Sequence, residues 1–361
     1  MKLMLLGFEN ICSRAIGRLL FTVGLSLAGA SQAFGQFTWS DWRNGQSIGS
    51  FYSVAGTANE TVAVGAMGSS GRIATRNNTT GIWVVQDFAT SSWFRDVIYA
   101  NNQYVAVREG GSIMTSPNGL TWTNQVSPTT NDLMTVLWDG NQYLAAGKNG
   151  TILTSTDAQT WTNRTSGTTA FFHNISYSGS QYVAVGNNIV RISTDGISWS
   201  APVAAPPPTY FVGATWTGTR FIIGGLGFST TPTLYGSSDG LTWTLLNSAF
   251  KEDIRSIVTV GGSVFITGAF DGTGNGFVYQ TLDGVALTNT YLSPNGSEYF
   301  MGIAYNGSDL IVAGFNHNVF ATAIPEPATY ATLLGLASLG FAVWRTNRLR
   351  HRRQHNFPAS A

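Results

Sequence analysis

Side chains suited to acid–base, thiol or metal chemistry are sparse in this 361-residue chain. Between residues 36 and 324 the two histidines, His173 and His317, lie far apart, and the only cysteine, Cys12, precedes this region. The loop Asp271–Gly276 begins like a calcium-binding loop, but no carboxylate occupies its closing position. We therefore predict no thiol catalysis, no metal site and no cofactor.

The charge balance of the central region argues against a nucleic-acid partner. Residues 36–324 contain 11 Lys+Arg and 16 Asp+Glu, a net charge of 11 − 16 = −5, so the whole-chain value of +1 comes from the two ends. Nucleic-acid surfaces require clustered basic residues, and this region shows no such cluster.

A polar turn followed by tryptophan recurs, as STDGISW at 193–199 and SSDGLTW at 237–243, with one departure each in SPNGLTW at 116–122 and STDAQTW at 155–161. A carboxylate or amide in such a turn accepts backbone N–H groups, glycine supplies a positive φ, and tryptophan buries a large apolar face. We expect structural roles for Asn118, Gly119, Trp122, Asp157, Trp161, Asp195, Gly196, Trp199, Asp239, Gly240 and Trp243.

Aromatic residues gather where one strand-like stretch leads into the next. These are Trp93, Phe94, Phe172, Tyr210, Phe250 and Tyr299. Two interpretations remain open for this set: the rings form a face that grips a sugar or a partner, or they pack between structural units.

The elements that position these residues follow from an internal repeat. Segments starting with QYVAV at Gln103, QYLAA at Gln142 and QYVAV at Gln181 begin 39 residues apart, and looser copies begin at residues 60, 220, 263 and 309. Each copy contains four short runs of alternating apolar residues joined by Asn-Asn, Asp-Gly or Gly-rich turns. Four antiparallel strands per repeat of about 40 residues predict a β-propeller.

Seven inner strands can be counted, at 50–55, 95–100, 134–138, 173–177, 212–216, 255–259 and 301–305. The last repeat ends after three strands, while the segment QFTWSDW at 36–42 resembles a missing outer strand. The sequence therefore predicts an all-β, seven-bladed propeller over 36–323, with four-stranded antiparallel blades. Pairing of Phe37–Trp42 with His317–Thr322 would close the ring.

The two ends of the chain read as targeting segments. Three basic residues, an apolar run at 19–30 and the small-residue stretch SQAFG predict a signal peptide over 1–35, cut by signal peptidase, with an uncleaved anchor as the alternative. The uncharged run at 328–344 predicts a single transmembrane helix, with a buried helix as the alternative. The arginines behind it should stay cytoplasmic, which places the propeller outside: Arg345, Arg348, Arg350, Arg352 and Arg353.

The C-terminal segment IPEPATYATLLGLASLGFAVWRTNRLRHRR resembles the PEP-CTERM sorting signal in its three parts: Pro325, Glu326 and Pro327, the apolar helix, and the arginines. This resemblance implies a bacterial exported protein, sorted through residues 324–361 by an exosortase that cuts near the Pro-Glu-Pro. The two prolines keep that segment extended, as presentation to a protease at the membrane requires.

The recurring turn resembles the Asp-box of sialidases, related BNR-repeat propellers and the photosystem II assembly-factor family. In those families the turn lies away from the active face, so the resemblance implies a fold and no chemistry. A sialidase would also need an arginine triad, a tyrosine–glutamate pair and an acid, and the Arg-Ile-Pro pattern of bacterial members is missing.

We expect a non-enzymatic scaffold at the cell surface or in the extracellular matrix that binds a polysaccharide or an envelope protein. A sialidase-like glycoside hydrolase and an assembly-factor-type chaperone are the alternatives.

Overall fold

The computed structural model describes residues 37–324 apart from 44, 90, 202, 204–205, 207–209, 228–232, 251, 270–274, 294–297 and 317. The predicted signal peptide, the Pro-Glu-Pro segment, the C-terminal helix and the terminal arginines lie outside these residues. Within the described part of the chain, no helix is long and apolar enough to cross a membrane. The compact unit formed by these residues spans Phe37–Ile324.

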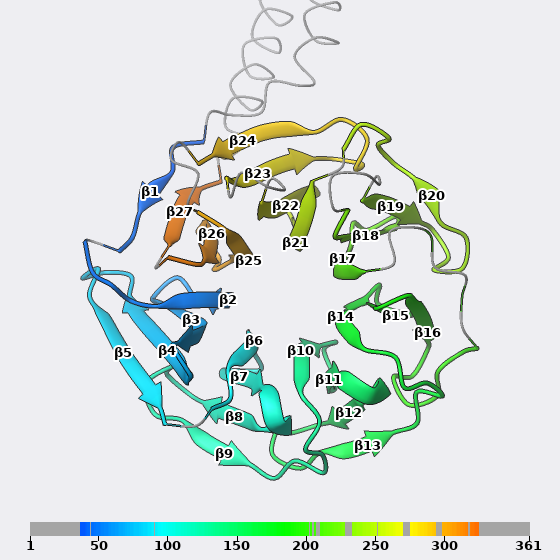
Figure 1. The fold of residues 1–361 in the computed structure, drawn as a ribbon, viewed down its shortest axis with the longest axis horizontal. Coiled ribbons are helices and arrows are strands. Elements are labelled where there is room, and N and C mark those ends of the chain that lie inside the picture. Colours follow the sequence, from blue (N-terminus) through cyan, green and yellow to red (C-terminus); the bar gives the residue numbers. More distant parts are fainter. Residues whose placement is uncertain are drawn as a thin grey trace, which may run out of the picture. The chain divides into compact units, whose positions relative to one another are not determined.

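Seven antiparallel sheets are arranged as blades around a common centre (Figure 1). Blade 1 contains β2 (Ser50–Gly56), β3 (Glu60–Met67), β4 (Ser70–Asn77) and β5 (Trp83–Phe88). Blade 2 contains β6 (Phe94–Ala100), β7 (Gln103–Arg108), β8 (Ile113–Ser116) and β9 (Thr123–Gln125). Blade 3 contains β10 (Leu133–Trp138), β11 (Tyr143–Gly147), β12 (Ile152–Ser155) and β13 (Thr162–Arg164). The 3₁₀ turns η1 (Glu109–Gly111) and η2 (Lys148–Gly150) lie in blades 2 and 3.

The second half of the ring repeats this order. Blade 4 contains β14 (Phe172–Tyr177), β15 (Tyr182–Gly186) and β16 (Ile189–Ser193). Blade 5 contains β17 (Phe211–Trp216), β18 (Phe221–Gly225), β19 (Leu234–Ser237) and β20 (Thr244–Leu245). Blade 6 contains β21 (Asp253–Val260), β22 (Ser263–Ala269), β23 (Gly276–Thr281) and β24 (Thr288–Leu292). Blade 7 contains β25 (Phe300–Tyr305), β26 (Asp309–Gly314), β27 (Val319–Ala323) and β1 (Ser40–Asp41). The predicted seven-bladed, all-β fold is thus confirmed, and the seven inner strands start within two residues of their predicted positions.

Ring closure uses the first described segment of the chain. Ser40 pairs with Ala321 and Asp41 with Phe320, so β1 becomes the outer strand of blade 7 (Figure 1). The Trp42 N–H donates to the carbonyl of Val319 at 3.0 Å. The predicted closure by the N-terminal strand is confirmed, with a regular ladder shorter than the predicted span.

Blade 4 departs from the predicted four strands, because its described residues form a three-stranded sheet. The chain after β16 reads SAPVAAPPP, and proline has no N–H to donate to a ladder. Two isolated contacts remain along this edge: Ser200 N–H to the Ile192 carbonyl at 2.9 Å, and Val203 N–H to the Val190 carbonyl at 3.1 Å.

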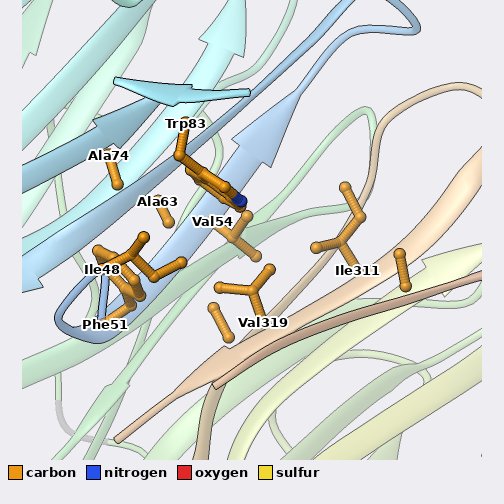
Figure 2. Close-up of a cluster of buried hydrophobic side chains, with 10 residues drawn as sticks. Ile48, Phe51, Val54, Ala63, Ala74, Trp83, Ile311 and Val319 are labelled. Carbon is orange, nitrogen blue, oxygen red and sulfur yellow. The ribbon is translucent and has the colours of Figure 1, made fainter. Parts of the chain in front are cut away.

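The hydrophobic core is divided into seven clusters, one at each seam between neighbouring blades. Figure 2 shows the seam between blades 7 and 1, where Phe51, Val54 and Trp83 meet Ile311 and Val319. The second strand of each blade contributes side chains to the seams on both sides of that blade, because successive side chains point to opposite faces of a strand. In β7, for example, Val105 and Val107 pack towards blade 3, while Tyr104 and Ala106 pack towards blade 1. Each blade is therefore held by its neighbours, and closure buries the last seam.

Candidate functional site

The two faces of the ring are built from different connections. We call hairpin face the side formed by the turns between first and second strands and between third and fourth strands. The opposite side is the linker face, formed by the turns between second and third strands and the linkers that enter each inner strand. The predicted site residues divide between these faces.

The recurring polar turns lie on the hairpin face and bind their own backbone. Asp157 Oδ1 accepts the N–H groups of Gln159 and Thr160, both at 2.8 Å. The same pair of bonds is made by Asp195, Asp239 and, with its amide oxygen, Asn118. These backbone N–H groups hold the pKa of the carboxyl groups below its usual value in Asp157, Asp195 and Asp239.

The rest of each turn serves packing. Gly119, Gly196 and Gly240 have φ near +70°, as the turn requires, and Ala158 adopts φ +61° in the turn without glycine. The tryptophan Nε1 groups of Trp122, Trp161 and Trp199 donate to the carbonyl three residues earlier, at 2.8, 3.0 and 3.3 Å respectively. The Trp243 ring packs at the seam between blades 4 and 5.

Two of these turns are also tied to the preceding blade by a glutamine side chain. Gln103 Nε2 of blade 2 donates to the Asp157 carbonyl at 3.3 Å and to Tyr143 Oη at 3.2 Å. Gln142 of blade 3 repeats both bonds, to the Asp195 carbonyl at 2.8 Å and to Tyr182 Oη at 3.2 Å. The glutamines that open two of the clear repeats, Gln103 and Gln142, therefore make inter-blade contacts with the tyrosine of the next repeat on the hairpin face.

Six aromatic residues were candidates for a ligand-binding face, and three of them are buried. Phe94 and Phe172 are fully buried and Phe250 is 7% exposed, because each ring fills a seam between blades. Trp93 and Tyr299 are half-buried, and Tyr210 is exposed. For the buried three the packing interpretation holds, and they are removed from the candidate face.

Every inner strand carries a β-bulge near its start, at the linker face. The pairing register shifts by one residue in all seven strands. The extra residues, all half-buried, are Tyr52, Arg95, Met134, His173, Val212, Arg255 and Met301. Bulges re-aim side chains and are common beside functional sites. We call these seven residues the central cluster.

In six blades a glycine of the second strand lies opposite the bulge, and its lack of a Cβ allows the two strands to approach closely there. A Cβ at Gly186 would lie 1.8 Å from the carbonyl oxygen of Phe171, and one at Gly147 would lie 1.9 Å from that of Asp132. In blade 2 the corresponding residue is Arg108, which faces Phe94 across the bulge. Its guanidinium lies 5.5 Å from the Phe94 ring centroid.

Aromatic and charged side chains meet where blades 7, 1 and 2 adjoin. Tyr52 stacks on Trp93 with ring centroids 6.1 Å apart and meets the Phe315 ring edge-on at 5.5 Å. The Arg95 guanidinium lies 4.5 Å from the Tyr52 centroid and 5.3 Å from that of Trp93. Arg95 also forms an ion pair with Glu109, with Nε 3.1 Å from Oε1. The flat faces of this group are therefore largely occupied by one another.

Further polar pairs continue around the linker face. Lys148 Nζ lies 2.5 Å from Asp132 Oδ2 and also faces the Phe171 ring. His173 Nε2 is 2.8 Å from Asn187 Oδ1, and its ring lies 4.3 Å from that of Phe171. Burial lowers the pKa of His173, and the charges of Arg95 and Arg255 lower it further, against the opposing hydrogen bond to Asn187.

One carboxylate lies deeper along the inner strands. Asp96 Oδ1 accepts from Ser53 Oγ at 2.7 Å and Oδ2 accepts the Val136 N–H at 2.9 Å, so it joins the inner strands of three blades. Burial raises the pKa of Asp96, and these hydrogen bonds oppose that shift. We regard Asp96 as a structural link, since its oxygens are engaged by the protein.

The described residues do not assemble the constellation of a sialidase. Arg95 and Arg255 reach the central cluster, while Arg108 covers Phe94 instead of joining them. Burial raises the pKa of Tyr52, which disfavours the phenolate that a nucleophile would need. Among these residues, no group of three His, Cys, Asp or Glu side chains could hold a metal ion.

Sequence reasoning missed the central cluster, although a pattern pointed to it. In six repeats the second strand carries a glycine at or near its end, as YLAAG at 143–147 and YVAVG at 182–186, and that glycine faces the bulge. Each inner strand has a large apolar residue at or near its start. The residue that follows it differs in type between blades. Variation inside an otherwise regular repeat was the available sign of a site.

No protein-family model matches the chain, and no curated protein matches its sequence. Solved structures share its fold. The structure described as YCF48 bound to D1 peptide is 14% identical with a TM-score of 0.62, covering 81% of this chain and 96% of that one. Catalytically inactive virginiamycin B lyase from Staphylococcus aureus, with quinupristin, is 11% identical with a TM-score of 0.67, covering 80% and 100%. The WD40 propeller domain of Doa1 is 8% identical with a TM-score of 0.61, covering 78% and 95%.

Proposed function

We propose that this chain is an exported cell-envelope protein whose propeller is a non-enzymatic scaffold that binds a polypeptide through its linker face. The observation that carries the proposal is the half-buried group of Tyr52, Trp93 and Arg95, flanked by Glu109 and Phe315. Tyrosine, tryptophan, arginine and methionine are the residues enriched where proteins bind proteins. On the hairpin face, by contrast, the polar side chains described above form hydrogen bonds within their own turns or with the next blade.

The contacts within this group favour a polypeptide over a polysaccharide. A sugar ring stacks on a free aromatic face, but Tyr52 has Trp93 and Arg95 against its ring and Phe315 at its edge. The ion pairs Arg95–Glu109 and Lys148–Asp132 present charges of both signs beside the rings. Such a mixed surface suits backbone amides and side chains of either charge.

The comparisons support a binding role at the level of the fold. A propeller of this shape has been captured with a peptide, as the description of the YCF48 structure states. An assembly-factor-type chaperone would be one form of the polypeptide binder proposed here. A sialidase-like hydrolase finds no support in the geometry of Arg95, Arg255 and Tyr52, although one propeller neighbour is a lyase.

Photo-crosslinking in the native cells tests the proposal. The full-length protein would carry p-benzoyl-L-phenylalanine at Tyr52 on the linker face, or at Leu241 on the hairpin face as the matched exposed control. We expect a protease-sensitive adduct from position 52 and a much weaker one from position 241. A protease-resistant, glycanase-sensitive adduct would instead indicate a polysaccharide, and equal labelling from both positions would contradict a linker-face site.

Export and sorting form a separate part of the proposal, resting on the sequence of the two ends. We propose that signal peptidase removes residues 1–35 and that an exosortase acts near Glu326, with the arginine tail cytoplasmic beforehand. Glu326→Ala should leave the unprocessed protein in the inner membrane, as seen by immunoblotting of cell fractions. Unchanged processing of that variant would rule out the exosortase step.

A further inference from the structure

The residue types of the central cluster follow a pattern around the ring. Its basic side chains come from blades 2, 4 and 6, as Arg95, His173 and Arg255. The intervening blades supply the uncharged side chains Tyr52, Met134, Val212 and Met301. From blade 1 to blade 7 an uncharged residue thus alternates with a basic one at the same structural position, and the two uncharged residues Met301 and Tyr52 follow one another where blade 7 adjoins blade 1.

Two of the basic side chains, Arg95 and Arg255, influence the third, His173, from other blades of the ring. Blades 2 and 4 are not neighbours, and neither are blades 4 and 6, yet the charges of Arg95 and Arg255 both act on His173. The inner strands that carry them surround the centre in Figure 1. The influence of both charges on His173, from blades that are not its neighbours, points to a space that the three side chains share.

The polar groups around these three basic residues pair with them unequally. Glu109 forms a close ion pair with Arg95, and Asp132 pairs with Lys148 at 2.5 Å. Asp253 approaches Arg255 only to 3.7 Å, beyond hydrogen-bond distance, and Arg255 Nε is buried with no hydrogen-bond partner among the described residues. His173 has an amide, Asn187, as its partner in place of a carboxylate.

We propose that the central cluster receives an acidic side chain of the bound polypeptide, its carboxylate held by Arg255 and His173. A planar guanidinium is well suited to a carboxylate. The methylene groups of an Asp or Glu residue would lie against Met134, Val212 and Met301, which line the alternate blades. This inference rests on the proposed function, because it names the part of the polypeptide that enters the site.

Two synthetic probes test this inference with the full-length protein in detergent. A fluorescent Glu-Ala repeat peptide and its Gln-Ala counterpart differ in charge and little in shape. We expect the acidic peptide to bind at least about tenfold more tightly, because a buried charge-assisted pair is lost in the amide. Arg255→Gln should remove this preference, while Arg220→Gln in the hairpin-face turn at 217–220 should retain it. Unchanged melting temperatures would show that both variants fold.

The outcomes separate this inference from the function on which it rests. Equal affinity for the two peptides, or a preference that survives Arg255→Gln, would overturn the acidic-residue site while leaving a linker-face polypeptide binder intact. Failure of both peptides, combined with a protease-sensitive adduct at position 52, would also overturn the acidic-residue site alone. Failure of both peptides with no such adduct would overturn both.

Discussion

The hairpin face and the linker face use polar residues in opposite ways. On the hairpin face the same residue types recur, and Asp157, Asp195 and Asp239 each bind two N–H groups of their own turn. At the linker face one position in each inner strand changes identity from blade to blade, and Arg255 Nε has no partner in the described part of the ring. The recurring residues thus make structural hydrogen bonds within their own turns, whereas the position that varies supplies a different side chain from blade to blade. Substitutions should therefore affect mainly stability on one face and mainly binding on the other.

The prediction with the largest expected effect concerns closure of the ring, on which both faces depend. Deleting Phe37–Trp42 removes β1 and the contacts of Trp39, whose Nε1 donates to the Thr290 carbonyl at 3.1 Å. The seam that contains Phe37 and Trp39 would lose two large side chains, at a cost of more than about 5 kcal/mol. Circular dichroism on heating should show a loss of the cooperative transition. A deletion that leaves the melting temperature unchanged would contradict closure.

A matched control for the deletion is Asp41→Ala. The Asp41 side chain is exposed and pairs with Arg43, so its loss should change stability by no more than about 0.5 kcal/mol. A similar effect from both changes would mean that β1 contributes through charge rather than strand pairing and packing.

The next largest effect concerns the bulge that sets the linker face. Gly186→Ala places a Cβ 1.8 Å from the Phe171 carbonyl oxygen, so the backbone beside His173 must move. We expect a loss of about 3 kcal/mol or more in urea unfolding. Gly179→Ala is the control, because Gly179 has φ +94° but open space around it, and should cost about 1–2 kcal/mol. Equal costs would show that close approach is not the constraint.

A smaller effect distinguishes hydrogen bonding from charge on the hairpin face. Asp239→Ala removes the acceptor for Leu241 and Thr242 N–H, at a cost of about 1–2 kcal/mol. Asp239→Asn should stay within about 0.5 kcal/mol, since Asn118 makes the same two bonds in blade 2. Chemical denaturation of the two variants measures both. A large loss in the asparagine variant would assign the stabilisation to the negative charge.

The smallest effect is a pH dependence from the linker face. The pKa of His173 is lowered in the folded protein, so the unfolded chain binds more protons as the pH falls below about 6.5. Stability from this group is therefore fully present above that pH and declines towards the folded-state pKa, by at most about 1.4 kcal/mol per pH unit. Nearby charges on the packed elements are Arg95, Arg255, Glu109, Asp132, Lys148 and Asp253.

Melting temperatures between pH 7 and pH 5 measure this contribution. His173→Gln should flatten the curve relative to the unaltered protein, since glutamine does not titrate. An unchanged slope would mean that His173 binds protons equally in the folded and unfolded states, which would contradict a lowered pKa in the folded protein.

Much of the architecture was predictable because it depends on repeated local features. The alternation in YVAV and YLAA, the Asn-Asn turn at 101–102 and the Asp-Gly turns specify hairpins without reference to the rest of the chain. The resemblance of QFTWSDW to the later outer strands likewise predicted closure. The fourth strand expected in blade 4 is not formed by the described residues, and the sequence SAPVAAPPP at 200–208 contains prolines, which cannot donate to a strand ladder.

The candidate site was predictable only in part, because a bulge shifts the strand by one residue. Two interpretations were open for the aromatics Phe94, Phe172 and Phe250, a ligand face or packing between blades, and the structure buries all three at seams. In the first two of these blades the next residue, Arg95 or His173, is the half-buried residue of the bulge. A one-residue shift exchanges inward and outward side chains, and no local pattern records it unless the glycine opposite is recognised.

By itself the sequence determined the number of blades, the polar turns and the strand that closes the ring. These features depend on side-chain alternation and turn chemistry, which act between residues close in the chain or repeated along it. Tertiary structure alone decided which residues occupy equivalent bulges around the centre: Arg95, His173 and Arg255 come from non-adjacent blades, and only a closed ring arranges their strands around one axis. Seam packing sets the place of each bulge, because the apolar residue before it is buried between blades and the next residue is left half-buried at the linker face.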